Sequence, residues 1–204
     1  MTFMIKSEHR AIFSTPLGAY ELAGISDELK LAEYIESKIE VGDDVTQTHW
    51  TLHEDPTLEP FIAKLKECIE HYMYGLFQYQ PDYSYEITQM WGNLMPPGCA
   101  IYQHSHHNNV IAGVFYPREQ KGFPALSFKR PAETCFEPTF VQFNEFNQGS
   151  YDIYPQKDML LLFPAWLQHT SKRNQTDKNR LSFSFNVMVR GRFDTENHLQ
   201  STIL

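Results

Sequence analysis

Three histidines and one arginine in the second half of the chain have the residue types and spacing of a metal site with a carboxylate-binding group beside it. His104 and His106 are separated by one residue in the sequence Tyr-Gln-His-Ser-His-His, which begins at Tyr102. Side chains alternate between the two faces of a strand, so we expect Tyr102, His104 and His106 to share a face and His107 to point away. Imidazole is a ligand for iron, copper, zinc or nickel. A polar strand end that leads into the following Asn-Asn turn would explain the same residues without a metal.

His169 and Arg180 lie at the two ends of a polar loop. His169 follows the apolar run Leu160 to Phe163, where it is either a third metal ligand or a hydrogen-bonded core residue. Arg180 begins an alternating strand whose uncharged polar face continues through Ser182. That face is either solvated or the lining of a cavity. In a cavity, the planar guanidinium would hold a carboxylate through two parallel hydrogen bonds, and Ser182 would donate a third.

The elements that must position these residues are short strands preceded by two helices. Ser26 is expected to cap the first helix and Gly42 to end it, and the second begins at Asp55 and ends between Gly75 and Pro81. From residue 85 onward, aromatic and β-branched runs are interrupted by Pro, Gly and Asn, which predicts seven or eight strands in a sandwich or jelly roll with the helices packed on one sheet. The expected strands are 87–94, 98–104, 110–116, 125–128, 151–154, 160–163 and 181–189.

The bulk composition indicates one folded domain. The 204 residues are 42% hydrophobic and 21% charged, as in ordinary globular proteins. A net charge of −8 without a basic stripe argues against a nucleic acid partner. No apolar run is long enough to span a membrane, so we expect no membrane partner and a cytoplasmic location. The three cysteines form no Cys-x-x-Cys pair and are expected to be reduced, buried thiols.

Three regions are expected within this single domain of residues 1–204. Residues 1–84 would form a support region, with a strand around residues 11–13 and the two helices. Residues 85–192 would form the jelly-roll core, and residues 193–204 a C-terminal tail.

Several short motifs, in their order and spacing, resemble the Fe(II)- and 2-oxoglutarate-dependent oxygenases. The closest resemblance is to a branch of small oxygenases that carry a His-x-His motif on a prolyl hydroxylase-like core, and it extends from residue 85 to the end of the chain. Each motif alone is weakly specific for this family, but the order and spacing of the whole set are more specific. The matching pieces are Trp91-Gly92-Asn93, Gly98 to His104, His104-Ser105-His106, Ala112-Gly113-Val114-Phe115-Tyr116, Leu161 to Pro164 before His169, and Arg180.

The resemblance implies a fold and a set of roles. The fold would be mainly β with N-terminal helices: a cupin-like jelly roll, also called a double-stranded β-helix. With dioxygen, such an enzyme would hydroxylate a substrate and release succinate and CO2. The implied Fe(II) ligands are His104, His106 and His169, and the implied contacts of 2-oxoglutarate are Arg180 and Ser182 at its distal carboxylate, together with Tyr102.

His106 departs from the family pattern, in which the second ligand is usually an Asp or Glu carboxylate. No Asp or Glu lies between Glu86 and Glu119. A neutral ligand leaves the site one charge more positive, which strengthens its attraction for the 2-oxoglutarate dianion and alters the redox behaviour of iron.

Two alternatives from other functional classes stay open. A cupin-like metalloprotein that does not use 2-oxoglutarate would have a natural use for three histidines. In a non-enzymatic β-sandwich binding or assembly module, the histidines would be incidental. Arg180, which follows His169 by eleven residues, favours the oxygenase. The sequence gives neither the substrate, a small molecule or a peptide, nor the oligomeric state.

Overall fold

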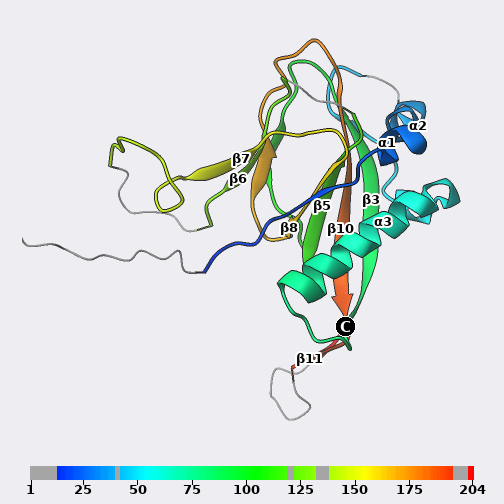
Figure 1. The fold of residues 1–204 in the computed structure, drawn as a ribbon. Coiled ribbons are helices and arrows are strands. Elements are labelled where there is room, and N and C mark those ends of the chain that lie inside the picture. Colours follow the sequence, from blue (N-terminus) through cyan, green and yellow to red (C-terminus); the bar gives the residue numbers. More distant parts are fainter. Residues whose placement is uncertain (1–12, 40–41, 119–121, 132–137, 195–201) are drawn as a thin grey trace, which may run out of the picture.

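Two antiparallel sheets form the body of the computed structural model (Figure 1). The structure describes residues 13–39, 42–118, 122–131, 138–194 and 202–204. The larger sheet has six strands in the order β1-β8-β5-β10-β3-β2, and the smaller sheet has four in the order β4-β9-β6-β7. From β3 to β10 the chain passes back and forth between the sheets, with β6 and β7 paired in the smaller one, which confirms the jelly roll expected from the sequence. The strand bounds are β1 Gly18–Glu21, β2 Thr46–Gln47, β3 Ser84–Met95, β4 Ile101–His104, β5 Ile111–Tyr116, β6 Leu126–Lys129, β7 Ser150–Ile153, β8 Met159–Pro164, β9 His169–Ser171 and β10 Arg180–Arg190.

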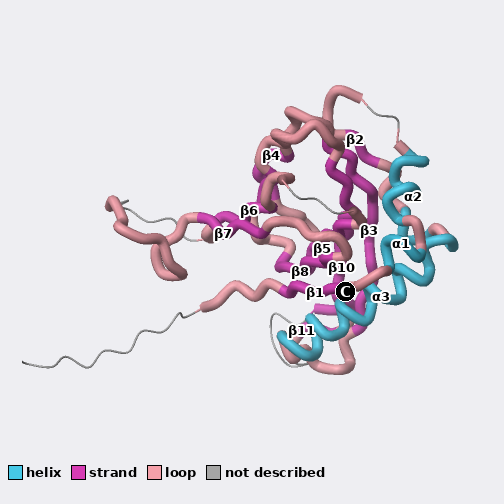
Figure 2. The backbone as a smooth tube through the Cα atoms, turned by 45° about the horizontal axis from the view of Figure 1, so that its top comes forward, coloured by secondary structure: helices cyan, strands magenta, loops and turns pink. Residues whose placement is uncertain are grey.

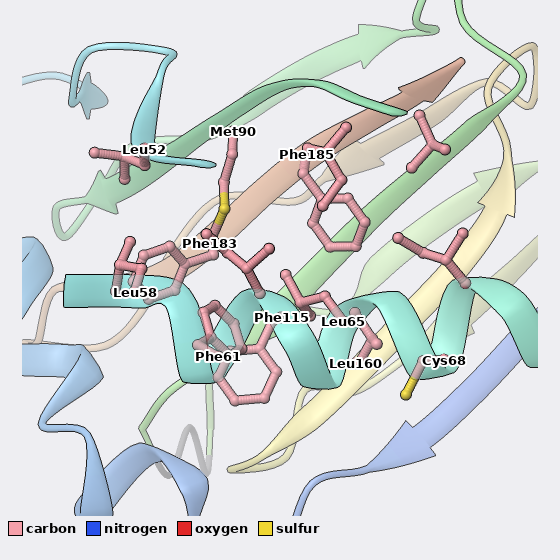
Figure 3. Close-up of a cluster of buried hydrophobic side chains, with 14 of the residues drawn as sticks. Leu52, Leu58, Phe61, Leu65, Cys68, Met90, Phe115, Leu160, Phe183 and Phe185 are labelled. Carbon is pink, nitrogen blue, oxygen red and sulfur yellow. The ribbon is translucent and has the colours of Figure 1, made fainter. Parts of the chain in front are cut away.

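Helices cover one face of the six-stranded sheet (Figure 2). The bounds are α1 Ile25–Glu28, α2 Leu31–Lys38 and α3 Glu59–Glu70, with 3-10 turns at Leu52–Glu54 and Pro56–Leu58 and a π-helical turn at His71–Leu76. Figure 3 shows α3 lying along the sheet, with apolar side chains of the strands gathered against it. The Phe61 ring packs 4.8 Å from Phe115 and 5.2 Å from Phe183, between ring centroids. The apolar face expected for the second helix is therefore buried on the sheet, as predicted.

The first expected helix is broken in two. Lys30 adopts a left-handed conformation (φ 51°) that separates α1 from α2, and α2 ends at Lys38, before the expected end at Gly42. The side chain of Ser26 caps nothing, and its hydroxyl is buried without a partner. Instead, Asp158 from the turn before β8 accepts a hydrogen bond from the backbone N–H of Ser26 (3.1 Å). The start of this helix is thus fixed by a residue far away in the sequence.

The seven expected strands are present, with ends that shift by a few residues. Strands β1, β2 and β9 were not expected, nor was a small hairpin of β11 (Arg192–Phe193) with β12 (Thr202–Ile203). Of the strand expected at 11–13, residues 11 and 12 lie outside the described residues, and Phe13 is not in a strand. The jelly-roll strands, from β3 to β10, extend from Ser84 to Arg190.

Gly113 allows β5 and β10 to pack closely. It pairs with Phe185 across the two strands, and the Phe185 ring lies over the glycine. A Cβ at Gly113 would lie 2.2 Å from Cζ of that ring. Only a residue without a side chain fits here.

No helix in the described ranges is long and apolar enough to cross a membrane. Cys68 is buried, as expected, whereas Cys99 is only partly buried, and neither forms a disulfide within the described residues. Cys135 lies outside the described residues.

Candidate active site

His104, His106 and His169 come together between the two sheets. Their side-chain nitrogens lie within 4.8 Å of one another. His104 ends β4, where it pairs with His169 at the start of β9. His106 was expected on the same strand as His104, but the strand stops at His104, because the backbone N–H of His106 turns to donate to the carbonyl oxygen of Ala165 (2.8 Å). The explanation by strand alternation is therefore wrong for His106, although its ring still joins the cluster.

Backbone carbonyls fix the orientation of two of the three rings. Nδ1 of His104 lies 2.8 Å from the carbonyl oxygen of Tyr102, and Nδ1 of His169 lies 2.9 Å from that of Leu167. A carbonyl oxygen only accepts, so each Nδ1 carries the hydrogen and each Nε2 keeps its lone pair. Nε2 of His106 lies 3.3 Å from Nε2 of His169. The cluster therefore holds three imidazoles close enough to share a metal ion, and two of them keep the Nε2 lone pair that a ligand needs.

The protonation state of the buried rings suits metal binding. Burial lowers the pKa of His106 to about 4, and the charges of His104 and His107 act in the same direction. Burial also lowers the pKa of His169 to about 4, against the hydrogen bond to Leu167, which raises it. Both rings are neutral at neutral pH, and only a neutral imidazole can bind a metal.

Arg180 is a buried cation in the wall of the cavity. Its side chain is 3% exposed. One terminal nitrogen donates to the hydroxyl of Ser171, and the other donates to the hydroxyl of Tyr116 (2.9 Å). Nε has no partner, and among the described residues no carboxylate pairs with the guanidinium. Burying an uncompensated charge is costly, so this arrangement indicates an anionic ligand.

Asn93 connects the strands of the larger sheet below the cavity. Its side chain is 4% exposed and all of its hydrogen-bonding groups are used. Oδ1 accepts from Gln47 Nε2 (2.9 Å) and Trp91 Nε1 (3.0 Å). Nδ2 donates to the hydroxyls of Ser184 (2.9 Å) and Ser182 (3.4 Å). Asn93 thereby fixes the side chains on either side of it.

One cavity of about 370 Å³ contains every residue proposed from the sequence for the site. Its floor is buried, and Tyr102 stands at its mouth with 87% of its surface exposed. His107 is exposed and does not belong to the cluster, in agreement with its expected direction. The predicted residues that line the cavity are Tyr102, His104, His106, His169, Arg180 and Ser182.

Three contacts were not foreseen. The sequence placed Asn93 in a motif without a role, left Tyr116 as either a pocket or a core residue, and assigned Ser171 to the polar loop after His169. Because β9 was not expected, the alternation from His169 to Ser171 was missed, although the spacing of two residues would have indicated a shared face.

Comparisons with known proteins find a matching family model and solved structures with a similar fold. Residues 89–186 match the family model described as "Putative 2OG-Fe(II) oxygenase". The sequence matches none of the curated proteins. Among solved structures, a 2OG-Fe(II) oxygenase family oxidoreductase from Burkholderia pseudomallei is 12% identical over 84% of each chain, with a TM-score of 0.60.

Two further structures are similar in fold. A prolyl-4-hydroxylase from Pseudomonas putida is 14% identical over 87% of this chain and 95% of its own, with a TM-score of 0.58. HygX from Streptomyces hygroscopicus, solved with nickel and 2-oxoglutarate bound, is 11% identical over 85% of this chain and 83% of its own, with a TM-score of 0.57. The three imidazoles and the unpaired buried arginine are the kinds of group that an iron ion and a dicarboxylate need.

Proposed function

This chain belongs to the 2OG-Fe(II) oxygenase superfamily, and from that premise we propose that it hydroxylates a C–H bond of a substrate held at the mouth of the cavity. As an oxidoreductase of this superfamily it uses Fe(II), 2-oxoglutarate and dioxygen. When bound, iron and 2-oxoglutarate supply the oxidising chemistry: one atom of dioxygen enters succinate, which forms with CO2, and the other enters the substrate as a hydroxyl group. The observation that carries the proposal is the unpaired, buried Arg180 in the same cavity as three converging imidazoles.

His104, His106 and His169 are the proposed ligands of the metal. Hydrogen bonds from Nδ1 to the carbonyls of Tyr102 and Leu167 hold two of the rings in the required tautomer. Groups that orient a ligand in this way also make it a better electron donor. The protein residues thus present lone pairs without needing to rearrange.

Arg180 is the proposed partner of the distal carboxylate of 2-oxoglutarate. Ser171 and Tyr116 hold its guanidinium in place, and its positive charge is left for a ligand to neutralise. Ser182, on the same face of β10, would donate a further hydrogen bond, and the hydroxyl of Tyr102 would approach the cosubstrate from β4. Because Arg180 and Ser182 are buried, a charge-assisted pair between them and a carboxylate is stronger than one in water.

An anaerobic titration tests the proposal. The purified protein is loaded with Fe(II) in the absence of dioxygen, and 2-oxoglutarate is then added. We expect a new visible absorption band from the iron chelate of the 2-oxo acid, and no band with succinate, which lacks the 2-oxo group. Admission of dioxygen should then convert 2-oxoglutarate to succinate and CO2.

The outcomes separate the functional classes. Iron binding without a band and without succinate formation would contradict the proposal and favour the cupin-like metalloprotein. Absence of iron binding would contradict both the oxygenase and the cupin-like metalloprotein. The substrate is proposed to be a small molecule or a peptide rather than nucleic acid, which the net charge of −8 disfavours.

A further inference from the structure

We infer that the substrate presents an aliphatic cation, an alkylammonium or guanidinium group, to the mouth of this cavity. The inference rests on the proposed function, because it concerns the substrate side of the same site. The argument depends on which hydrogen-bonding groups at the mouth remain free.

The residues at the mouth of the cavity are more exposed to solvent than those at its floor. Arg180 and Tyr116, at the floor, are almost fully buried. Asp44 and Gln47 also line the cavity but are exposed, and Trp91 is half-buried. These last three residues come from β2, the segment just before it, and the neighbouring strand β3. A substrate that approaches from solvent meets them before it reaches the floor.

Hydrogen-bond donors of Trp91 and Gln47 at the mouth, and of the buried Asn93 behind them, are used within the protein. Nε1 of Trp91 and Nε2 of Gln47 both donate to Oδ1 of Asn93. Nδ2 of Asn93 donates to the hydroxyls of Ser184 and Ser182. The amide oxygen of Gln47 has no partner among the described residues, so it remains as an acceptor at the mouth, where the exposed hydroxyl of Tyr102 is also found.

Asp44 adds a negative charge to the mouth. One carboxylate oxygen accepts from the backbone N–H of Val45 (2.7 Å), and within the described ranges no Lys or Arg pairs with the carboxylate. Arg180 is the only Lys or Arg of the described residues that lines the cavity, and it is held at the floor. A substrate carboxylate or phosphate would find few donors at the mouth and would be repelled by Asp44.

A cation satisfies each of these groups. Ammonium and guanidinium groups donate several hydrogen bonds and accept none, so they match the Asp44 carboxylate and the Gln47 amide oxygen. The indole of Trp91, the type of ring that attracts cations most strongly, stacks on His106 on one side (ring centroids 6.0 Å apart) and lines the cavity. The net charge of −8 on the chain favours the approach of cations over anions. The proposed hydroxylation then falls on an aliphatic carbon near the charged group.

Calorimetry with four amino-acid derivatives tests the inference. The probes are the Nα-acetyl methylamides of L-lysine, L-arginine, L-norleucine and L-glutamate, added anaerobically to protein loaded with Fe(II) and 2-oxoglutarate. Free L-lysine and L-arginine in parallel distinguish an amino acid from a residue in a peptide as the source of the cation. We expect a cationic probe to bind at least about tenfold more tightly than the norleucine derivative, a difference of about 1.4 kcal/mol.

Two neighbouring acids give a matched pair of variants. Asp44→Asn should weaken binding of the cationic probe by up to about fivefold, because an exposed ion pair contributes at most about 1 kcal/mol. Asp43→Asn should have no effect, because Asp43 does not line the cavity. Unchanged unfolding temperatures would establish that both variants are folded.

Several results would overturn the inference. One is that the norleucine or glutamate derivative binds as tightly as the cationic probes. Another is that Asp44→Asn and Asp43→Asn change the affinity for the cationic probe equally. A third is that neither cationic probe binds at about 10 mM, well above a Kd of 1 mM. The iron–2-oxoglutarate band is measured separately. Loss of that band would refute the proposed function, whereas an intact band without selectivity for cations would refute only this inference.

Discussion

His106 places a neutral imidazole where the superfamily usually has a carboxylate, and substitutions there can tell a ligand from a bystander. His106→Ala should weaken Fe(II) binding by at least about tenfold, because it removes one of three donors. His106→Asp should restore binding, because it supplies the anionic oxygen of the usual triad. The measurement is iron stoichiometry and affinity after anaerobic reconstitution.

A nearby histidine gives the control for this experiment. His107 is exposed and lies outside the cluster, so His107→Ala should leave the iron stoichiometry unchanged. If His106→Ala also bound iron and 2-oxoglutarate as the wild type does, His106 would not be a ligand. The proposed three-histidine set would then be withdrawn.

Arg180 is proposed to hold the distal carboxylate of 2-oxoglutarate. Arg180→Ala should weaken 2-oxoglutarate binding roughly ten- to hundredfold, because a hydrogen bond to a charged group contributes about 1.5–3 kcal/mol. Binding of iron should persist, since Arg180 is not among the proposed metal ligands. Calorimetry on the wild type, Arg180→Ala and Arg118→Ala would test this, because Arg118 pairs with Glu36 on the surface. Equal affinities in all three proteins would contradict the role of Arg180.

At the scale of elements, Gly113 sets the distance between β5 and the Phe185 ring. Gly113→Ala would place a methyl group 2.2 Å from that ring, so the ring or the strand must move. We expect a loss of about 1–3 kcal/mol in the free energy of unfolding, the usual range for overpacking. Gly149→Ala should be nearly neutral, because a Cβ added there would have no atom within 4 Å. Denaturant unfolding of both variants checks this, and similar losses in the two would show that the close contact does not matter.

Asp55 joins two helical segments and makes their stability depend on pH. It accepts a hydrogen bond from the hydroxyl of Tyr34 in α2 (2.6 Å) and from the N–H of Thr57 at the start of the helical region that leads into α3. The Tyr34 hydrogen bond, with those from Thr57, lowers the pKa of Asp55 from 3.8 to about 2. A lowered pKa means that this stabilisation is present above about pH 4 and is lost as the pH falls toward 2.

The matching test compares the wild type with Asp55→Ala. At neutral pH, the variant should be less stable by about 1 kcal/mol, the usual effect of removing a helix cap. The difference should shrink between about pH 4 and pH 2, where the carboxylate becomes protonated. A difference that stays constant through this range would mean that the charge of Asp55 contributes nothing.

Local patterns predict the elements that have a local cause. The alternation of β10 correctly separated the apolar residues under the helices from Arg180 and Ser182 in the cavity. The capping of α1 by Asp158 could not be predicted, because it depends on a contact between residues more than a hundred positions apart. The left-handed conformation of Lys30 has no signal in the sequence. Strands β1 and β2 are short edge strands without a marked pattern, and they form because β8 and β3 offer them free edges. The burial of Arg180 against Tyr116 likewise needs both sheets in place.

At the scale of the whole molecule, the site lies between the two sheets, so ligands should hold them together. His104 and His169 belong to the smaller sheet, and Arg180 belongs to the larger one. Iron together with 2-oxoglutarate should therefore raise the unfolding temperature more than iron alone. A ligand present at a hundred times its Kd adds about 2.7 kcal/mol to the free energy of unfolding. Thermal unfolding under nitrogen, with and without a chelator, measures this effect, and equal temperatures with and without 2-oxoglutarate would contradict it.

The central position of β10 has a consequence for synthesis on the ribosome. β10 is the last strand of the larger sheet to be made, yet it lies between β5 and β3 and pairs with both. Until residue 190 has emerged, these two older strands have no partner on those edges, and unpaired edges are prone to association with other chains. Pairings between segments so distant in the sequence also form slowly. The nascent chain therefore carries both histidines of β4 and β9 before it has the strand that brings Arg180, and a complete site arises only after β10 has emerged.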